Sequence, residues 1–177
     1  MSLLRPLGLR LAVRGVLGWD RDDSDIDDGR GDMATRTGTT TWSGSLQDGS
    51  GSVELTSSKL GTFDVSWPKR TSDEAGGTTS PEELIGAAHS ACFSMAFSNE
   101  LAQAGASDIR LTVRADVQFG PDPKGGFGIR GIKLTARGTA QGIDESAFVK
   151  AAEAAKVGCP VSKALTGTEI TLDAALG

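Results

Sequence analysis

The sequence has few of the residues that mark several common classes of protein. Its 177 residues include two cysteines and one histidine, too few for the disulfide framework of a small secreted protein or for a zinc site without carboxylates. No hydrophobic run approaches the roughly 18 residues of a membrane span. The net charge of −5 gives no basic excess for binding phosphates. We therefore expect no metal, no membrane insertion and no nucleic-acid partner.

The rest of the composition is that of an ordinary globular domain, except near the N-terminus. Hydrophobic residues make up 38% of the chain and charged residues 23%, which suits one domain with its own core. Residues 20–32 consist mostly of Asp, Arg and Gly and cannot form a core. We expect residues 1–32 to be a disordered or spurious extension, with a targeting segment as the alternative. Residues 33–177 should form the folded domain.

Local sequence patterns predict an α+β fold with antiparallel strands in the order β-β-β-α-β-β-α-β. Alternating apolar and polar residues indicate strands, and apolar residues three or four apart indicate helices. The alternation changes parity at Arg130-Gly131, which predicts a β-bulge. The expected strands span residues 39–46, 53–56, 62–67, 109–119, 127–136 and 168–174, and the expected helices span residues 81–104 and 145–157.

The first of these helices has clear signals at both ends. Ser80 is the expected N-cap, Pro81 takes the first helical position, and Glu83 completes a capping box. Gly105 should end the helix. Small or apolar residues lie on nearly every side, which is typical of a buried helix. The residues at helical spacing are Leu84, Ala88, Ala91, Cys92, Met95 and Ala96.

One apparent motif is a chance match. Residues 126–131 read GFGIRG and fit the G-x-G-x-x-G pattern of dinucleotide-binding proteins. That pattern requires a helix directly after the glycines, whereas a strand is expected here.

Cys92 lies in the middle of the long helix, where a free cysteine is more often a small hydrophobic residue than a nucleophile. The helix dipole has faded at that position, and burial raises the pKa of a thiol. A reactive Cys92 therefore requires a cation from another element, and Lys69, Arg70 and Lys163 are the candidates. Glu82, in the first turn, either complements the helix dipole or holds an arginine that also reaches the sulfur.

Cys159 precedes Pro160 at the expected start of another helix, so it occupies an N-cap position. Free backbone N–H groups stabilise a thiolate there; the alternative is a linker cysteine without function. His89, three residues before Cys92, is either half of a Cys–His dyad for acyl transfer or a packed helix residue.

Two segments resemble the motifs of the family of osmotically inducible protein C (OsmC) and organic hydroperoxide resistance (Ohr) proteins. Residues 80–96, SPEELIGAAHSACFSMA, resemble the signature helix, and residues 158–163, GCPVSK, resemble the second motif. Ala88-His89 is closer to the OsmC branch. The resemblance extends from about Thr39 to the C-terminus. It implies an intertwined homodimer with antiparallel sheets outside and the signature helices at its centre.

The same resemblance implies a thiol peroxidase in oxidative or osmotic stress defence. Cys92 would be the peroxidatic cysteine and Cys159 the resolving one; Arg70, with Lys69 as the alternative, would activate Cys92, and Glu82 would anchor the arginine. Organic hydroperoxides would be the substrates and a lipoyl-type dithiol the reductant, with no cofactor and a cytoplasmic location. The alternatives are a Cys92/His89 acyl-transfer enzyme and a non-catalytic binding domain.

Overall fold

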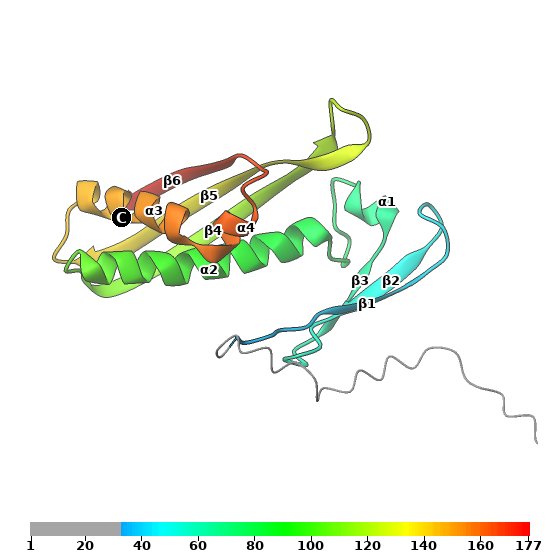
Figure 1. The fold of residues 1–177 in the computed structure, drawn as a ribbon, viewed down its shortest axis with the longest axis horizontal. Coiled ribbons are helices and arrows are strands. Elements are labelled where there is room, and N and C mark those ends of the chain that lie inside the picture. The colour runs from blue at the N-terminus through cyan, green and yellow to red at the C-terminus, as the bar shows by residue number, and fades with distance from the viewer. Residues whose placement is uncertain (1–32) are drawn as a thin grey trace, which may run out of the picture. The chain divides into compact units, whose positions relative to one another are not determined.

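The computed structural model describes residues 33–177, and the expectation for residues 1–32 lies outside them. The first elements of the described residues form a small antiparallel sheet in the order β1-β2-β3 (Figure 1). The first strand begins at Thr39, as predicted, whereas the second strand begins and ends earlier than predicted. These strands are β1 (Thr39–Ser43), β2 (Ser50–Glu54) and β3 (Thr62–Val65).

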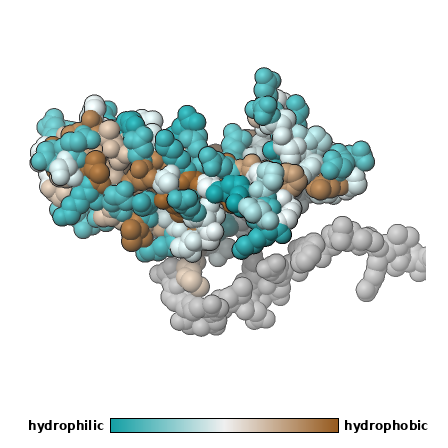
Figure 2. Space-filling view, turned by 90° about the horizontal axis from the view of Figure 1, so that it is seen from above, coloured by the Kyte–Doolittle hydropathy of each residue, from teal (hydrophilic) through white to brown (hydrophobic). Residues whose placement is uncertain are grey.

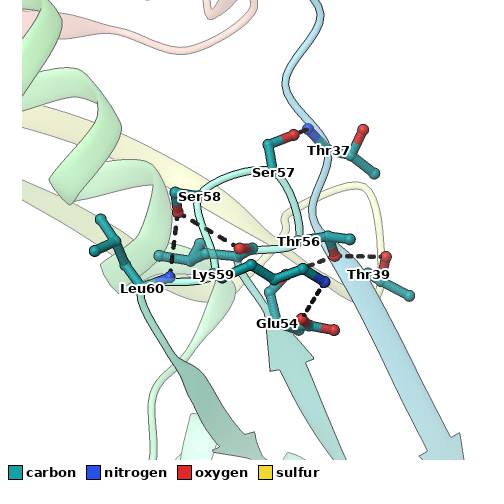
Figure 3. A network of polar contacts seen from close by, with 9 residues as sticks. Thr37, Thr39, Glu54, Thr56, Ser57, Ser58, Lys59 and Leu60 are labelled. Atoms are coloured by element: carbon teal, nitrogen blue, oxygen red, sulfur yellow. Dashed lines mark hydrogen bonds and ion pairs between the residues drawn. The ribbon is translucent and has the colours of Figure 1, made fainter.

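The turn between β2 and β3 is held by surface polar contacts (Figure 3). The ammonium group of Lys59 lies 2.9 Å from a carboxylate oxygen of Glu54. The backbone N–H of Thr37 donates to the hydroxyl of Ser57 at 2.6 Å. Exposed ion pairs of this kind contribute little stability, so the network fixes the course of the turn and carries no indication of function.

A second sheet has the order β4-β5-β6. Strands β4 (Ser107–Pro121) and β5 (Phe127–Gln141) pair antiparallel, and the register shifts by one residue beside Arg130, which confirms the predicted bulge. Strand β6 (Ile170–Leu176) pairs parallel to β5, so the expectation of antiparallel strands is wrong for this pair. The reason is that a helical crossover separates the two strands, and such a connection returns the chain in the same direction.

The long helix α2 (Pro81–Gln103) begins as its sequence predicts. The hydroxyl of Ser80 accepts the backbone N–H of Glu83 at 3.1 Å. The carboxylate of Glu83 accepts from the hydroxyl of Thr79 rather than from the backbone of Ser80, so the capping box is half formed. Gly105, at φ +90°, follows the helix end in the left-handed conformation that favours glycine.

Within one chain α2 is buried along one side only, against β4 and the helices that follow β5. Gly86 belongs to this side because a Cβ there would lie 3.0 Å from the carbonyl oxygen of Ala115 on β4. The opposite side is exposed, with Met95 73% accessible. The expectation of a helix buried on nearly every side is therefore wrong within one chain, and the residues given for their helical spacing lie largely outside its core. The buried positions are Glu82, Gly86, His89, Phe93, Phe97 and Leu101.

Helices α3 (Glu145–Gly158) and α4 (Pro160–Ala164) pack against α2 (Figure 1). The carboxylate of Asp144 accepts the backbone N–H of Ala147 at 2.8 Å, which confirms the predicted cap. Phe148 on α3 meets Phe97 on α2 with ring centroids 4.8 Å apart. This contact lies in the core of the domain, next to the junction of α3 and α4 that carries Cys159.

A short helix, α1 (Trp67–Arg70), was not predicted. The sequence up to Trp67 was expected to continue a strand, but the hydroxyl of Ser66 accepts the backbone N–H of Lys69 and caps a single helical turn. The indole of Trp67 packs edge-on against the ring of Phe127 on β5, with centroids 5.3 Å apart. This turn determines where Arg70 lies.

None of the helices in residues 33–177 is long and apolar enough to cross a membrane. The face of the molecule in Figure 2 shows hydrophilic side chains interspersed with hydrophobic ones.

Candidate active site

The fold brings the two cysteines together. Cys92 comes from the middle of α2 and Cys159 from the junction between α3 and α4, and their sulfur atoms lie 3.2 Å apart. Both are free thiols; Cys159 is fully buried and Cys92 is partly exposed. A small rearrangement of either side chain brings the sulfurs to bonding distance, so the pair is suited to reversible disulfide formation.

The surroundings of the two thiols move their pKa values in opposite directions. Burial raises the pKa of Cys92, and the neighbouring Cys159 adds to this effect, against a lowering by the N–H of Val161. Burial also acts to raise the pKa of Cys159, but the N–H and hydroxyl of Ser162, with Cys92 and the N–H of Val161, together lower it. Cys159 occupies the predicted N-cap position of α4. In the isolated chain Cys159 is therefore the thiol that ionises more readily.

Arg70 and Glu82 form a second pair. A terminal nitrogen of Arg70 lies 2.6 Å from Oε1 of Glu82, and its Nε lies 3.1 Å from Oε2. The guanidinium also stacks 4.2 Å from the ring centre of Phe119. The carboxylate side chain is 9% exposed and the arginine 28%, so most of the pair is removed from water. Lys69, the alternative cation, is exposed.

Within one chain the arginine pair and the cysteine pair are separate. Glu82 and Cys92 lie nearly three turns apart on α2, about 15 Å along its axis, which exceeds the reach of an arginine held at Glu82. Arg70 is also absent from the groups that shift the pKa of Cys92. Arg70 therefore does not activate the cysteine of its own chain in this conformation.

His89 is buried and bonds away from Cys92. Its Nε2 lies 2.8 Å from the hydroxyl of Ser162, while its Nδ1 has no hydrogen-bond partner among the described residues. Burial lowers the pKa of His89, so the ring is neutral at pH 7. Ser162 was missed by sequence reasoning; its position three residues after Cys159, in the first turn of α4, was the available signal.

A cavity of about 440 Å³ lies beside Arg70. Its wall is mostly apolar and comes from the first sheet, α1 and the start of α2. Leu84 lines this cavity, whereas Phe93 lies in the core and Met95 on the exposed side of α2. The apolar lining consists of Trp42, Leu46, Val53, Val65, Trp67, Pro81 and Leu84.

Residues 33–177 contain no group of three or more potential ligands placed to hold a metal ion. Two adjacent thiols, one of them near a helix N-terminus, have the arrangement that thiol–disulfide chemistry requires.

Comparison with known proteins identifies the family. The model of the OsmC-like protein family matches residues 73–174. The chain is 42% identical over 132 residues to peroxiredoxin OsmC of Escherichia coli, covering 75% of this chain and 90% of that protein. The chain belongs to the OsmC-like family.

Solved structures show the same fold. An organic hydroperoxide resistance protein from Elizabethkingia anophelis aligns with a TM-score of 0.66 and 27% identity, over 83% of this chain and 99% of that one. The organic hydroperoxide resistance protein OhrB of Bacillus subtilis aligns with a TM-score of 0.60 and 25% identity, over 80% of this chain and 98% of that one. The expected α+β, OsmC-like fold is confirmed.

Proposed function

We propose that this protein is a thiol peroxidase that reduces organic hydroperoxides to alcohols. The observation that carries the proposal is the 3.2 Å separation of the Cys92 and Cys159 sulfur atoms. The names of its relatives, peroxiredoxin and organic hydroperoxide resistance protein, support a role in hydroperoxide defence.

The chemistry follows from the exposure of the two thiols. Cys92 is the more accessible, so its thiolate attacks the terminal oxygen of the hydroperoxide. The O–O bond breaks, the alcohol leaves, and Cys92 becomes a sulfenic acid. Cys159 then attacks this sulfur, forming a disulfide and releasing water. The disulfide is reduced by an external dithiol, for which a lipoyl-type dithiol protein is our expectation, and the cytoplasm is the expected location.

The activating cation for Cys92 comes from a partner subunit in this proposal. The exposed side of α2 carries small or apolar residues at positions 84, 87, 88, 91 and 95, which allow a second helix to approach closely. Positions 82 and 92 are each five residues from Ala87. If two copies of α2 cross antiparallel with the twofold axis beside Ala87, position 82 of one copy therefore lies opposite position 92 of the other. Arg70, held by Glu82, then lies near Cys92 of the partner subunit and lowers its pKa.

The apolar cavity beside Arg70 supports an organic substrate. Hydrogen peroxide gains nothing from an apolar wall, whereas an alkyl or aryl group buries apolar surface there, about 25 cal/mol for each Å². The cavity adjoins the arginine that the proposed dimer places near the partner's thiol. A preference for bulky hydroperoxides follows.

A mass measurement tests the proposal directly. The reduced protein is treated with one equivalent of cumene hydroperoxide, and its intact mass is measured after quenching. We expect the loss of two hydrogens, with Cys92 and Cys159 recovered in one disulfide-linked peptide pair. An unchanged mass together with unconsumed peroxide would refute a peroxidase and favour a non-catalytic binding domain. The acyl-transfer alternative has no structural support, because His89 bonds to Ser162.

A further inference from the structure

Two polar links connect α2 to the chain around α4, and they lie one helical turn apart. The first is the Cys92–Cys159 sulfur contact at 3.2 Å. The second joins His89 and Ser162 at 2.8 Å. His89 precedes Cys92 by three residues, and Ser162 follows Cys159 by three. The second link therefore stacks directly on the first, through the first turn of α4.

The second link lies where a polar pair is costly. His89 is 0% exposed and Ser162 is 6% exposed, beside a core of phenylalanine, leucine and alanine. The Nδ1 of His89 finds no partner among residues 33–177, and a buried polar atom left without one destabilises the fold. An apolar residue would pack at this position without that cost. Stability alone therefore does not account for a histidine here.

The unpartnered nitrogen determines the tautomer. A neutral imidazole has one N–H, and a buried N–H without an acceptor is rarer than an unsatisfied acceptor. This preference places the proton on Nε2, so that Nε2 donates to the Ser162 oxygen 2.8 Å away. The hydroxyl hydrogen of Ser162 is then free for another acceptor. Cys159 is buried three residues earlier in the chain, and this hydroxyl acts to lower the pKa of its thiol.

We propose that His89 and Ser162 are positioning residues for the resolving step, forming a donor chain from the imidazole through the hydroxyl to the Cys159 sulfur. This inference rests on the proposed function. The chain stabilises negative charge on Cys159 and keeps it directed at Cys92. The lowering of the Cys159 pKa by the Ser162 hydroxyl agrees with this direction of donation.

The step balances without a further reactant. A sulfur–sulfur bond forms between Cys159 and Cys92 as the sulfur–oxygen bond of the Cys92 sulfenic acid breaks. The thiol proton of Cys159 leaves with the departing hydroxide as water. Cys159 is oxidised, and the sulfenic sulfur of Cys92 is reduced. The donor chain acts on the charge that develops at Cys159 while its proton departs.

The charged groups on the neighbouring elements are engaged elsewhere or exposed. Besides the cysteines, the titratable residues on the elements facing His89 include Lys156 and Lys163 on the helices and Arg114 and Asp116 on β4. Arg114 and Asp116 pair with each other, Lys156 pairs with Glu153, and Lys163 is exposed. Burial is the cause that lowers the pKa of His89, so the ring acts as a neutral donor.

The test separates the two half-reactions in the full-length protein. After one equivalent of cumene hydroperoxide, dimedone traps the Cys92 sulfenic acid and intact mass follows the disulfide, across the pH range in which thiols titrate. In Ser162→Ala we expect disulfide formation to slow by about tenfold, as for the loss of a hydrogen bond to a charged group. Its pH midpoint should rise, and dimedone labelling should increase. The rate of disulfide formation should fall, whereas the rate of peroxide consumption should change little.

Three further variants complete the test. His89→Leu should reproduce the pH shift, whereas His89→Gln, which keeps an N–H donor at similar reach, should restore most of the rate. Val161→Ala is the matched control, because it weakens the packing of α4 without removing a hydroxyl, and its pH midpoint should stay at the wild-type value. An unchanged midpoint in Ser162→Ala, or an equal shift in Val161→Ala, would overturn the inference while leaving the peroxidase intact. Failure of the wild-type protein to consume peroxide would instead overturn the proposed function.

Discussion

The guanidinium of Arg70 holds the carboxylate of Glu82 at two points, with a 2.6 Å contact to Oε1 and a 3.1 Å contact to Oε2. This pair lies at the first turn of α2, nearly three turns before Cys92. A cation placed there acts on a thiol only if a second chain brings that thiol to it. The separation of Arg70 from Cys92 along α2 therefore makes the proposed chemistry depend on dimer formation.

Arg70→Ala should lower stability and reactivity together. Removing the guanidinium leaves the mostly buried Glu82 carboxylate unpaired, at a cost of about 2–3 kcal/mol in the free energy of unfolding. In the dimer the pKa of Cys92 should rise, because its cation is lost. Urea unfolding measures the first effect, and thiol alkylation against pH measures the second. Lys69→Ala, at an exposed neighbouring position, is the control; a pKa shift there but not in Arg70→Ala would transfer the role to Lys69.

Replacement of each cysteine should separate their roles. Cys92→Ser should abolish peroxide consumption, because a serine hydroxyl is not ionised at neutral pH. Cys159→Ser should retain one stoichiometric turnover, lose cycling and leave Cys92 open to over-oxidation. Single-turnover peroxide assays and intact mass measure both outcomes. If Cys92→Ser consumed one equivalent as fast as wild type, the roles would have to be exchanged.

A charge on the exposed side of α2 should break the proposed dimer. Ala88→Arg places a cation in the expected helix–helix contact, and peroxidase activity should fall at least tenfold because Arg70 no longer reaches the partner's thiol. Ala154→Arg, on an exposed position of α3, is the matched control and should change neither property. Light scattering gives the assembly state. A wild-type monomer at micromolar concentration, fully active, would contradict the shared site.

The N-terminal segment should contribute nothing to the dimer or the site. A chain beginning at Met33 should keep the melting temperature, assembly state and peroxidase rate of the full-length protein. The reason is that residues 1–32 lack the apolar helical pattern that α2 presents for burial by a second chain. Calorimetry and the peroxidase assay measure these quantities side by side. A large fall in melting temperature would show that the segment packs on the domain.

Stability should decrease as the solution is acidified through the titration of His89. Burial lowers the folded-state pKa of this histidine below its ordinary value of 6.5, so the unfolded chain binds the proton more readily. The stability that the neutral, buried His89 contributes is fully present above pH 6.5 and is lost as the pH falls toward the folded-state pKa. The loss is about 1.4 kcal/mol for each pH unit that separates the folded and unfolded pKa values. Melting temperatures across this range should fall less steeply in His89→Gln. Parallel curves of melting temperature against pH for wild type and His89→Gln would show that His89 is not the cause of the pH dependence.

The sequence by itself determined the local features. Capping residues and helix-ending glycine fixed the bounds of α2 because these signals act within a few residues. Alternating polarity located β4 and β5, and a change of parity located the bulge at Arg130. The two motifs around Cys92 and Cys159 were sufficient to identify the family through resemblance, which the comparisons confirmed.

Only the tertiary structure decided which residues meet. The turn α1 went unpredicted because one hydroxyl cap on Ser66 outweighed the strand pattern, and β6 runs parallel because a helical crossover precedes it. Helical periodicity could not tell which side of α2 faces the core, since both sides carry small and apolar residues. The bonding of Ser162 with His89, and the separation of Arg70 from Cys92, depend on contacts between segments far apart in the chain. Such contacts arise from the packing of distant segments, and local sequence patterns do not predict them.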